Sequence, residues 1–276
     1  MAGILYVVGT PIGNLGDFSP RAKEILQSAD FIAAEDTRVT LKLLNKFEIK
    51  TPMVSYHEHN HKLRGEQILS RLLSGEDCAL VTDAGMPAIS DPGEDLVKLA
   101  HENNITVSSV PGPSAVITAL ALSGMPSGRF SFEGFLSTNK QSRRDHLESL
   151  KNDTHTLIFY EAPHKLTQTL ESMLSVFGDR ELCLCKELTK LHETVMHTTL
   201  LKSVEHFKAN SPRGEYVLIV SGAKPRVEAP MTLEQALEIA KEHIKSGESA
   251  SAAAKAAAAE SKIAKSDIYK ALTAKI

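Results

Sequence analysis

Short apolar runs recur along the first half of the chain, and segments whose apolar residues repeat with helical spacing separate them. The runs predict strands at residues 4–8, 31–34, 53–55, 78–82 and 106–110. The helical spacing predicts helices near residues 20–28, 40–47, 62–74, 94–102 and 115–122. Strands that alternate with helices need crossover connections, so we expect a mostly parallel sheet.

The same alternation continues beyond a segment rich in glycine and proline at residues 124–128, which predicts a domain hinge. The expected strands lie at residues 130–135, 156–160, 181–185, 194–198 and 216–220. The expected helices lie at residues 143–150, 164–177 and 201–208. Since no helix separates the strands at 181–185 and 194–198, the second sheet should be mixed.

The last part of the chain is helical in pattern. Thr232 predicts the start of a helix that reaches about residue 245, Gly247 ends it, and helices at 249–260 and 266–275 follow. The turn at 260–264 is typical of a helix-turn-helix, which reads nucleic acid. Lysines and acids nearly balance there, so a helical cap or a dimer contact is an alternative that stays open.

The fold class is therefore α/β, with two α/β domains and a small C-terminal helical unit. The expected domains are residues 1–125 with a mostly parallel sheet and 126–222 with a mixed sheet. A linker at 223–230, containing Pro225 and Pro230, and a helical appendage at 231–276 complete the chain.

Composition narrows the setting in which the protein works. No apolar run is long enough for a membrane span, and the N-terminus offers no signal-like segment, so we expect a cytoplasmic protein with no membrane contact. Cys78, Cys183 and Cys185 fit neither a disulfide framework nor a zinc pattern, which predicts buried thiols. The net charge of −3 means that any RNA contact must come from a local basic patch.

Two loops dense in glycine and proline follow predicted strands, at residues 9–14 and 83–87. Glycine allows close backbone approach and proline stiffens the path, so such loops have a defined shape. At the carboxyl ends of neighbouring strands they form the wall of a small-molecule crevice. The spacing of Gly9, Gly13 and Gly16 departs from the dinucleotide fingerprint, and no P-loop motif occurs. A plainer alternative is that these glycines are needed only for turns.

Two aspartates belong to the second loop and its continuation. The carboxylate of Asp83 can accept hydrogen bonds from a ligand or attract a cation, and a turn or helix-capping role is equally compatible with its position. Asp91 precedes Pro92, Gly93 and Glu94, which predicts that Asp91 caps the next helix.

Taken in order, several motifs resemble the tetrapyrrole methylase superfamily. The matching segments are residues 9–15, 34–38, 82–93, 111–115, 159–164 and 186–190. The resemblance covers most of residues 3–222. It is closer to the branch that methylates a ribose 2′-oxygen on a cytidine of small-subunit (16S) ribosomal RNA. The cobalamin and siroheme branches show G-x-G-P-G-D and G-D-P where this chain has GTPIGN at 9–14 and TDAG at 82–85, which favours the RNA branch.

The resemblance implies S-adenosyl-L-methionine bound in a crevice between the two α/β domains, usually in a homodimer. It implies small-subunit rRNA or the 30S ribosomal subunit as the partner. Carried over by motif, the cofactor-binding residues are Thr10, Pro11, Asp83, Ala84, Gly85, Met86, Pro87, Ser114, Ala115, Tyr160, Leu188, Glu215 and Val217.

The chemistry needs placement of the acceptor oxygen and a base for the poorly nucleophilic ribose hydroxyl. Glu161 and Asp36 are the candidate proton acceptors, and Lys186 is the candidate for orienting the ribose or phosphate. Ion pairs at the domain interface are the alternative reading of these charges.

Basic and imidazole side chains are the candidate substrate contacts. Lysine and arginine at the start of a predicted helix can neutralise phosphates, with a solvated helix start as the ordinary alternative. The predicted substrate-binding residues are Arg38, His57, His59, Lys140, Arg143 and Arg144. His57, His59 and His61 alternate along a stretch that we expect to be extended, which would place them on one face and could hold zinc. Methyl transfer needs no metal, so we predict no metal site and a substrate-facing rim instead.

The absence of tryptophan and the aromatic content of 5% argue against a base-stacking platform. Two other functions remain alternatives: a C-methyltransferase of tetrapyrrole biosynthesis, and a nucleotide-responsive DNA-binding regulator that uses the C-terminal helices. The sequence leaves open the target nucleotide, the identity of the base, and whether naked rRNA or an assembled subunit is the substrate.

Overall fold

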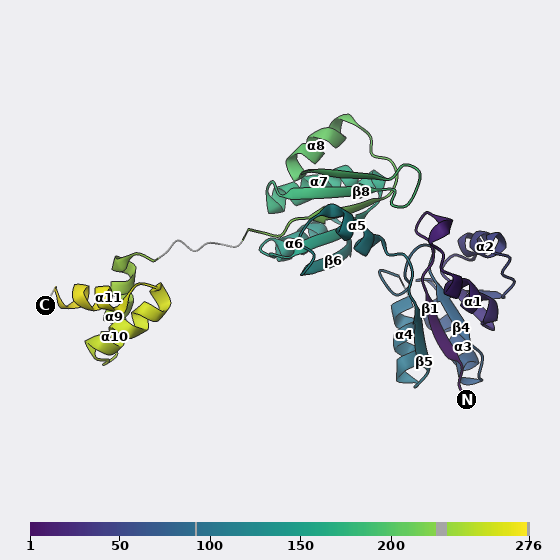
Figure 1. The fold of residues 1–276 in the computed structure, drawn as a ribbon, viewed down its shortest axis with the longest axis horizontal. Helices are drawn as coiled ribbons and strands as arrows, with labels where there is room; N and C mark the ends of the chain where they lie inside the picture. The colour runs from purple at the N-terminus through teal and green to yellow at the C-terminus, as the bar shows by residue number, and fades with distance from the viewer. Residues whose placement is uncertain (92, 225–230, 275–276) are drawn as a thin grey trace. The chain divides into compact units, whose positions relative to one another are not determined.

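The computed structural model describes residues 1–91, 93–224 and 231–274. The chain divides into two compact units, Met1–Ala223 and Lys224–Ile276 (Figure 1). Most of the predicted linker at 223–230 lies outside the described residues, so that prediction stays a prediction.

The first sheet is wholly parallel, with strand order β3-β2-β4-β1-β5. Its strands are β1 (Ile4–Val8), β2 (Phe31–Ala34), β3 (Met53–Ser55), β4 (Cys78–Val81) and β5 (Thr106–Val110). The connecting helices are α1 (Pro20–Ser28), α2 (Thr37–Lys46), α3 (His61–Leu73) and α4 (Gly93–Glu102), with a 3₁₀ turn η1 (Leu15–Asp17) after β1. Because β1 lies between β4 and β5, the loops that follow these strands meet at one edge of the sheet.

Apolar residues on alternate positions of the strands feed two separate cores, one on each face. Leu26 of α1 and Leu44 of α2 pack with Ile32 on one face. Leu72 of α3 and Leu96 of α4 pack with the residues of the opposite face. Strands that are buried on both faces read as continuous apolar runs, which is the pattern seen in the sequence.

The second sheet is mixed, as predicted, with strand order β6-β7-β10-β8-β9. Its strands are β6 (Phe130–Phe135), β7 (Thr156–Glu161), β8 (Glu181–Lys186), β9 (Thr194–Thr199) and β10 (Tyr216–Val220). Only β6 and β7 pair in parallel, while the pairs that join β7, β10, β8 and β9 are antiparallel. Its helices are α6 (Lys140–Leu150), α7 (Pro163–Phe177) and α8 (Leu200–Ala209), and α7 and α8 pack on one face.

Helix α5 (Ala115–Ser123) covers the other face of the second sheet (Figure 1). Val116, Ala119 and Leu120 pack with Ile158 and Val217. By its packing, α5 therefore belongs with the second sheet, although the hinge predicted from glycine and proline lies after it. A hinge motif marks backbone freedom, whereas the membership of a helix in a domain depends on which apolar face it covers.

The C-terminal unit consists of α9 (Leu233–Lys245), α10 (Ala250–Ser261) and α11 (Lys265–Thr273). Thr232 and Gln235 form a capping box at the start of α9, and Ser249 caps α10. The buried residues between these helices are mostly alanines, with Ile268 and Leu272 from α11. Small side chains allow close helix packing but bury little apolar surface for each contact. In the part of the chain that is described, no helix is both long and apolar enough to span a membrane.

Candidate functional site

Three loops of the first sheet are packed tightly against one another at its carboxyl edge. Thr10 and Gly85 exchange backbone hydrogen bonds of 2.9 and 3.1 Å, which join the loops after β1 and β4. A Cβ atom on Gly9 would lie 2.6 Å from the Cα of Gly112 and 2.7 Å from the Sδ of Met86. Only glycine at position 9 permits this approach, and Gly85 has a φ of +91°, so both loops need the residue they have.

A pocket of about 370 Å³ opens beside these loops and is lined by residues of both sheets. The predicted residues that line it are Asp83, Ala84, Ala115, Tyr160, Glu161, Leu188, Glu215 and Val217. The predicted cofactor residues Thr10, Pro11, Gly85, Met86, Pro87 and Ser114 belong to the surrounding loops, and none of them is among the lining residues within the described chain. We interpret them as residues that shape the wall behind the lining.

Further lining residues were not predicted from the sequence as site residues. They are Ile12, Glu35, Thr82, Ile89, Ser90, Asp91, Phe135, Ala162, Cys185, Lys190 and Tyr216. Glu35 directly precedes Asp36, and Ile89 continues the second glycine loop, so extending each motif by a few residues would have found them. Phe135 ends a strand and carries no signal in the sequence that would link it to a pocket.

Carboxylates from neighbouring loops form one side of the pocket. Thr82 Oγ1 donates to Glu35 Oε2 at 2.5 Å, and the backbone N–H of Asp36 donates to Asp83 Oδ1 at 3.1 Å. Partial burial, and then the charge of Glu35, raise the pKa of Asp83. Among the described residues no donor meets the other Asp83 oxygen, so Asp83 offers the pocket a free acceptor of increased basicity.

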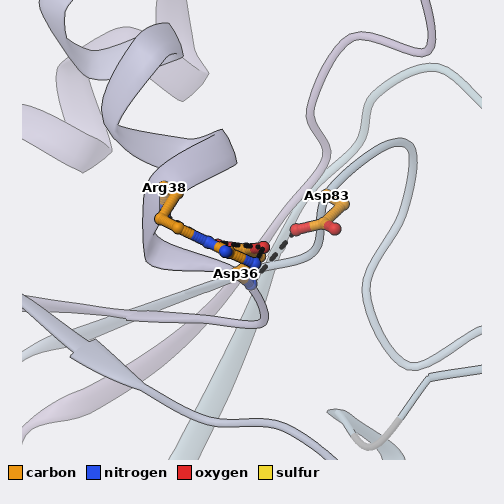
Figure 2. Close-up of polar contacts among 3 residues, drawn as sticks. All are labelled: Asp36, Arg38 and Asp83. Atoms are coloured by element: carbon orange, nitrogen blue, oxygen red, sulfur yellow. Dashed lines mark hydrogen bonds and ion pairs between the residues drawn. The ribbon is translucent and has the colours of Figure 1, made fainter.

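Asp36 caps the start of α2. Its carboxylate accepts the backbone N–H of Arg38 at 2.8 Å and pairs with the Arg38 guanidinium at 2.6 Å. Figure 2 shows the Arg38 side chain beside the Asp36 carboxylate, while Asp83 contacts the Asp36 backbone. Hydrogen bonds from Arg38 lower the pKa of Asp36 to about 2. A carboxylate with so low a pKa is a weak base, which disfavours the predicted proton-accepting role.

Asp91 shapes the segment that leads into α4. Its Oδ1 accepts the amides of Ala88 at 2.9 Å and Gly93 at 2.8 Å, and its Oδ2 accepts the amide of Ile89 at 3.4 Å. The bond to Gly93, the first residue of α4, agrees with the predicted capping role. Ala88 and Ser90 both have positive φ angles, of 65° and 64°, so the chain turns sharply on either side of Ile89.

The second sheet contributes an apolar surface. The ring of Tyr160 lies 4.8 Å from that of Phe132 and 5.4 Å from that of Phe135. Val217 is the register partner of both Tyr160 and Cys185, so these three residues form a row across β7, β10 and β8. Burial raises the pKa of Tyr160. The three cysteines are buried and free, as predicted.

Glu161 lines the pocket, but neighbouring residues donate hydrogen bonds to both of its carboxylate oxygens. It is 2% exposed, Thr169 Oγ1 donates to its Oε2 at 2.5 Å, and the Ala162 N–H donates to its Oε1 at 2.9 Å. Since both oxygens already accept hydrogen bonds, we interpret Glu161 as a positioning residue and no longer as the base.

Within the described chain, Lys190 lines the pocket and the predicted Lys186 does not. Its Nζ donates to Glu187 Oε1 at 3.2 Å and to Glu215 Oε2 at 2.8 Å. Burial opposes the charged form, but hydrogen bonds from Lys190 to Glu215 and Glu187 outweigh it and raise the pKa of Lys190. The ammonium group is therefore fixed beside the pocket.

The predicted basic cluster divides into two kinds of residue. Arg143 is 4% exposed and donates to Ser172 Oγ at 3.1 Å and to the carbonyl oxygens of Ser137 and Thr138 at 3.0 and 3.2 Å. Its prediction as an RNA contact is corrected, because its donors satisfy carbonyls that precede α6. Lys140 and Arg144 are exposed at the start of α6 and stay predicted phosphate contacts.

The predicted extended histidine stretch is wrong, because residues 58–60 form a turn. The Asn60 side chain accepts the backbone N–H of His57 at 2.9 Å, and His61 begins α3. The centroids of the His57 and His59 rings lie 6.0 Å apart. Both residues stay predicted substrate contacts. Across residues 1–91, 93–224 and 231–274, no three His, Cys, Asp or Glu side chains gather in a way that could hold a metal ion.

Comparison with known proteins adds a family and named relatives. Residues 4–205 match the family described as Tetrapyrrole (Corrin/Porphyrin) Methylases. The chain is 45% identical over 268 residues to a ribosomal RNA small subunit methyltransferase I of Synechocystis, covering 97% of this chain and 96% of that protein. It is 43% identical over 272 residues to the protein of the same name from Bacillus subtilis, covering 97% and 93%.

Two solved methyltransferase structures share the fold at low sequence identity. A uroporphyrin-III-C-methyltransferase from Thermus thermophilus is 17% identical, with a TM-score of 0.56, covering 79% of this chain and 94% of that one. A cobalt precorrin-4 methyltransferase of cobalamin biosynthesis is also 17% identical, with a TM-score of 0.59 and the same coverage. These likenesses concern the fold alone.

Proposed function

The chain belongs to the tetrapyrrole methylase family, and from this premise we propose that it methylates the 2′-oxygen of a cytidine ribose in small-subunit rRNA, with S-adenosylmethionine as methyl donor. The observation that carries the proposal is the similarity over 97% of the chain to proteins named ribosomal RNA small subunit methyltransferase I. The two solved methyltransferases, at 17% identity, are distant relatives in fold only. This contrast supports the RNA substrate over a tetrapyrrole.

The pocket suits a sulfonium nucleoside in size and chemistry. Among the carboxylates that line it, Glu35 favours a positively charged ligand through its charge. The apolar surface of Tyr160, Leu188 and Val217 suits the faces of a nucleoside. S-adenosylmethionine would supply an activated methyl group there. Ala84 and Ala115 also line the pocket.

Asp83 is the carboxylate that we propose as proton acceptor for the ribose hydroxyl. Its pKa is raised and one of its oxygens is free, whereas Asp36 has a pKa of about 2 and Glu161 has both oxygens engaged. A base that accepts the hydroxyl proton as the new bond forms contributes about 10²–10⁴-fold to such a reaction. Glu161, held by Thr169, keeps the end of β7 and the adjacent Tyr160 in position.

RNA contacts would come from exposed cations at the start of α6. Lys140 and Arg144 lie at the start of α6, directly after the strand and loop that contain Phe135. Phosphate neutralisation by such residues supplies affinity without reading the base sequence. Arg38 is exposed but paired with Asp36, so its contribution to RNA binding should be smaller. The family resemblance also supports a cytoplasmic location and a homodimer, and sedimentation of the purified protein would measure its oligomeric state.

Methyl transfer to defined acceptors tests the proposal. Purified protein and S-adenosylmethionine labelled on the methyl group are offered small ribosomal subunits, naked 16S rRNA or uroporphyrinogen. We expect label in rRNA, and mass-spectrometric mapping should place it on the ribose of a cytidine. Label in uroporphyrinogen alone, or on a base of the RNA, would contradict the proposal. The two RNA arms also decide whether the assembled subunit is required.

A further inference from the structure

Two large apolar side chains that line the pocket are nevertheless exposed to solvent. Ile89 is 51% exposed and Phe135 is 55% exposed. The apolar lining residues Leu188 and Val217, in contrast, are each 6% exposed. Ile89 follows β4 of the first sheet and Phe135 ends β6 of the second. We call Ile89 and Phe135 the apolar rim, because both line the pocket and both are also exposed to solvent.

The backbone on both sides of Ile89 has an unusual conformation that exposes the Ile89 side chain. Ala88 and Ser90 adopt positive φ angles, which non-glycine residues rarely do. The Asp91 carboxylate holds this conformation by accepting the amides of Ala88 and Ile89. Strain of this kind persists only where the surrounding structure fixes it, and it is concentrated at functional sites. The projection of Ile89 is therefore a defined feature of the loop.

Phe135 is aimed by an irregularity in its strand. The pairing of β6 with β7 shifts register between Phe132 and Phe135, and Gly134 has a φ of +63°. A bulge of this type changes the direction of a side chain, often beside an active site. A Cβ on Gly134 would lie 3.4 Å from the side-chain Oγ of Ser90, so the segments that contain the two halves of the rim lie next to each other. Tyr160 then supports the Phe135 ring from inside the pocket.

We propose that the apolar rim holds the base of the target nucleotide, with that base stacked on Phe135 and covered by Ile89. The inference rests on the proposed function. The acceptor hydroxyl must enter the pocket to reach the methyl donor, so the base on the same ribose has to lie at the pocket opening, outside its RNA stack. An exposed aromatic ring offers such a base a stacking partner. The low aromatic content argues against a surface that stacks many bases, but the single ring of Phe135 can stack on one base.

Substitution of Phe135 tests this assignment, with Phe130 as the matched control. Phe130 begins the same strand, is 38% exposed, and is absent from the pocket lining within the described chain. We expect Phe135→Ala to reduce kcat/KM for the RNA substrate by about 5- to 150-fold, the range for loss of one base stack. The affinity for S-adenosylmethionine should stay unchanged. Phe130→Ala should match the wild type in both measurements.

Aromatic rescue separates stacking from general packing. Phe135→Trp should keep most of the activity on RNA, whereas Phe135→Leu, which is apolar but has no ring, should resemble Phe135→Ala. Equal activity of the Leu and Trp proteins would overturn the stacking role. A loss of donor affinity in Phe135→Ala that matches its loss of activity would instead assign the rim to the donor. If the wild type does not methylate RNA at all, the proposed function fails, and this inference with it.

Discussion

The two sides of the pocket are built from different parts of their sheets and have different chemistry. The acidic wall, Glu35, Thr82 and Asp83, comes from the ends of parallel strands and the loops that follow them. The apolar wall, formed by Tyr160, Cys185 and Val217, is a row of neighbouring strand residues. Polar groups gather where parallel strands end, because exposed backbone and loops meet there, while a strand face offers a smooth apolar surface.

This difference implies a division of work within the proposed reaction. The acidic wall supplies charge, a proton acceptor and close backbone contact. The apolar wall supplies area for the flat faces of nucleosides and ends in Phe135 at the opening. Substitutions in the acidic wall should therefore affect the chemical step or the shape of the loops, and substitutions towards the rim should affect the RNA substrate alone.

The largest expected effect is that of Asp83→Asn. Because the amide cannot accept the hydroxyl proton, kcat should fall by about 10²–10⁴-fold while donor affinity stays close to that of the wild type. Single-turnover methyl transfer and a separate donor titration measure the two quantities. An equal loss of donor affinity would make Asp83 a donor contact, as the family resemblance implies, and not the base.

The pH dependence of the wild type sharpens the same point. The carboxylate of Asp83 must be ionised to accept a proton, and its pKa is raised above the ordinary value. Activity should therefore rise with pH through that raised pKa, and Asp83→Asn should lose this step from its residual activity. A profile with the same acidic limb in both proteins would assign the limb to another group.

Gly9→Ala should have the next largest effect, because it distorts the acidic wall. The added Cβ would lie 2.6 Å from the Cα of Gly112, which is backbone and cannot move aside cheaply. We expect the free energy of unfolding to fall by about 1–3 kcal/mol, as for overpacked cores, together with weaker donor binding. Gly128→Ala is the control, since no atom of the described residues, apart from its chain neighbours, lies within 4 Å of the added Cβ. Urea denaturation of the two variants would measure the free energy of unfolding, and titration with the donor would measure binding.

Asp36→Asn should have the smallest effect, and only on stability. The folded-state pKa of Asp36 is lowered to about 2 from 3.8, so ionised Asp36 stabilises the folded state above pH 3.8. That contribution is lost as the pH falls from 3.8 through 2. The wild type should therefore be slightly more stable than Asp36→Asn at neutral pH, and the difference should vanish towards pH 2. A large loss of methyl transfer in this variant would restore Asp36 as the candidate base.

Much of the fold follows from the sequence, because alternating apolar runs and helical spacing are local signals. The β1 and β6 strands and the α1 helix have the predicted bounds. Helix α2 begins three residues early, at Thr37, because Asp36 caps it. The packing of α5 on the second sheet was not predictable from the hinge motif, since its apolar residues would suit either sheet.

The parts of the candidate site that depend on the shape of the backbone were predictable from the sequence. The parts that depend on the direction of single side chains were less predictable. The two glycine loops come together, as their position after parallel strands requires. Arg143 shares the buried face of α6 with Leu147, so a basic cluster in the sequence is not a basic patch in space. Phe135 depends on a register shift that no local pattern records, and the paired state of Glu161 depends on Thr169 in the next helix.

The central claim is that the two walls form one site for the methyl donor, and titration calorimetry with S-adenosylmethionine tests it most directly. The wild type should bind one molecule for each chain. Gly9→Ala, which distorts the acidic wall, and Val217→Phe, which fills the apolar wall, should each weaken binding in protein that remains folded. No heat with the wild type, or undiminished binding when either wall is altered, would contradict the claim.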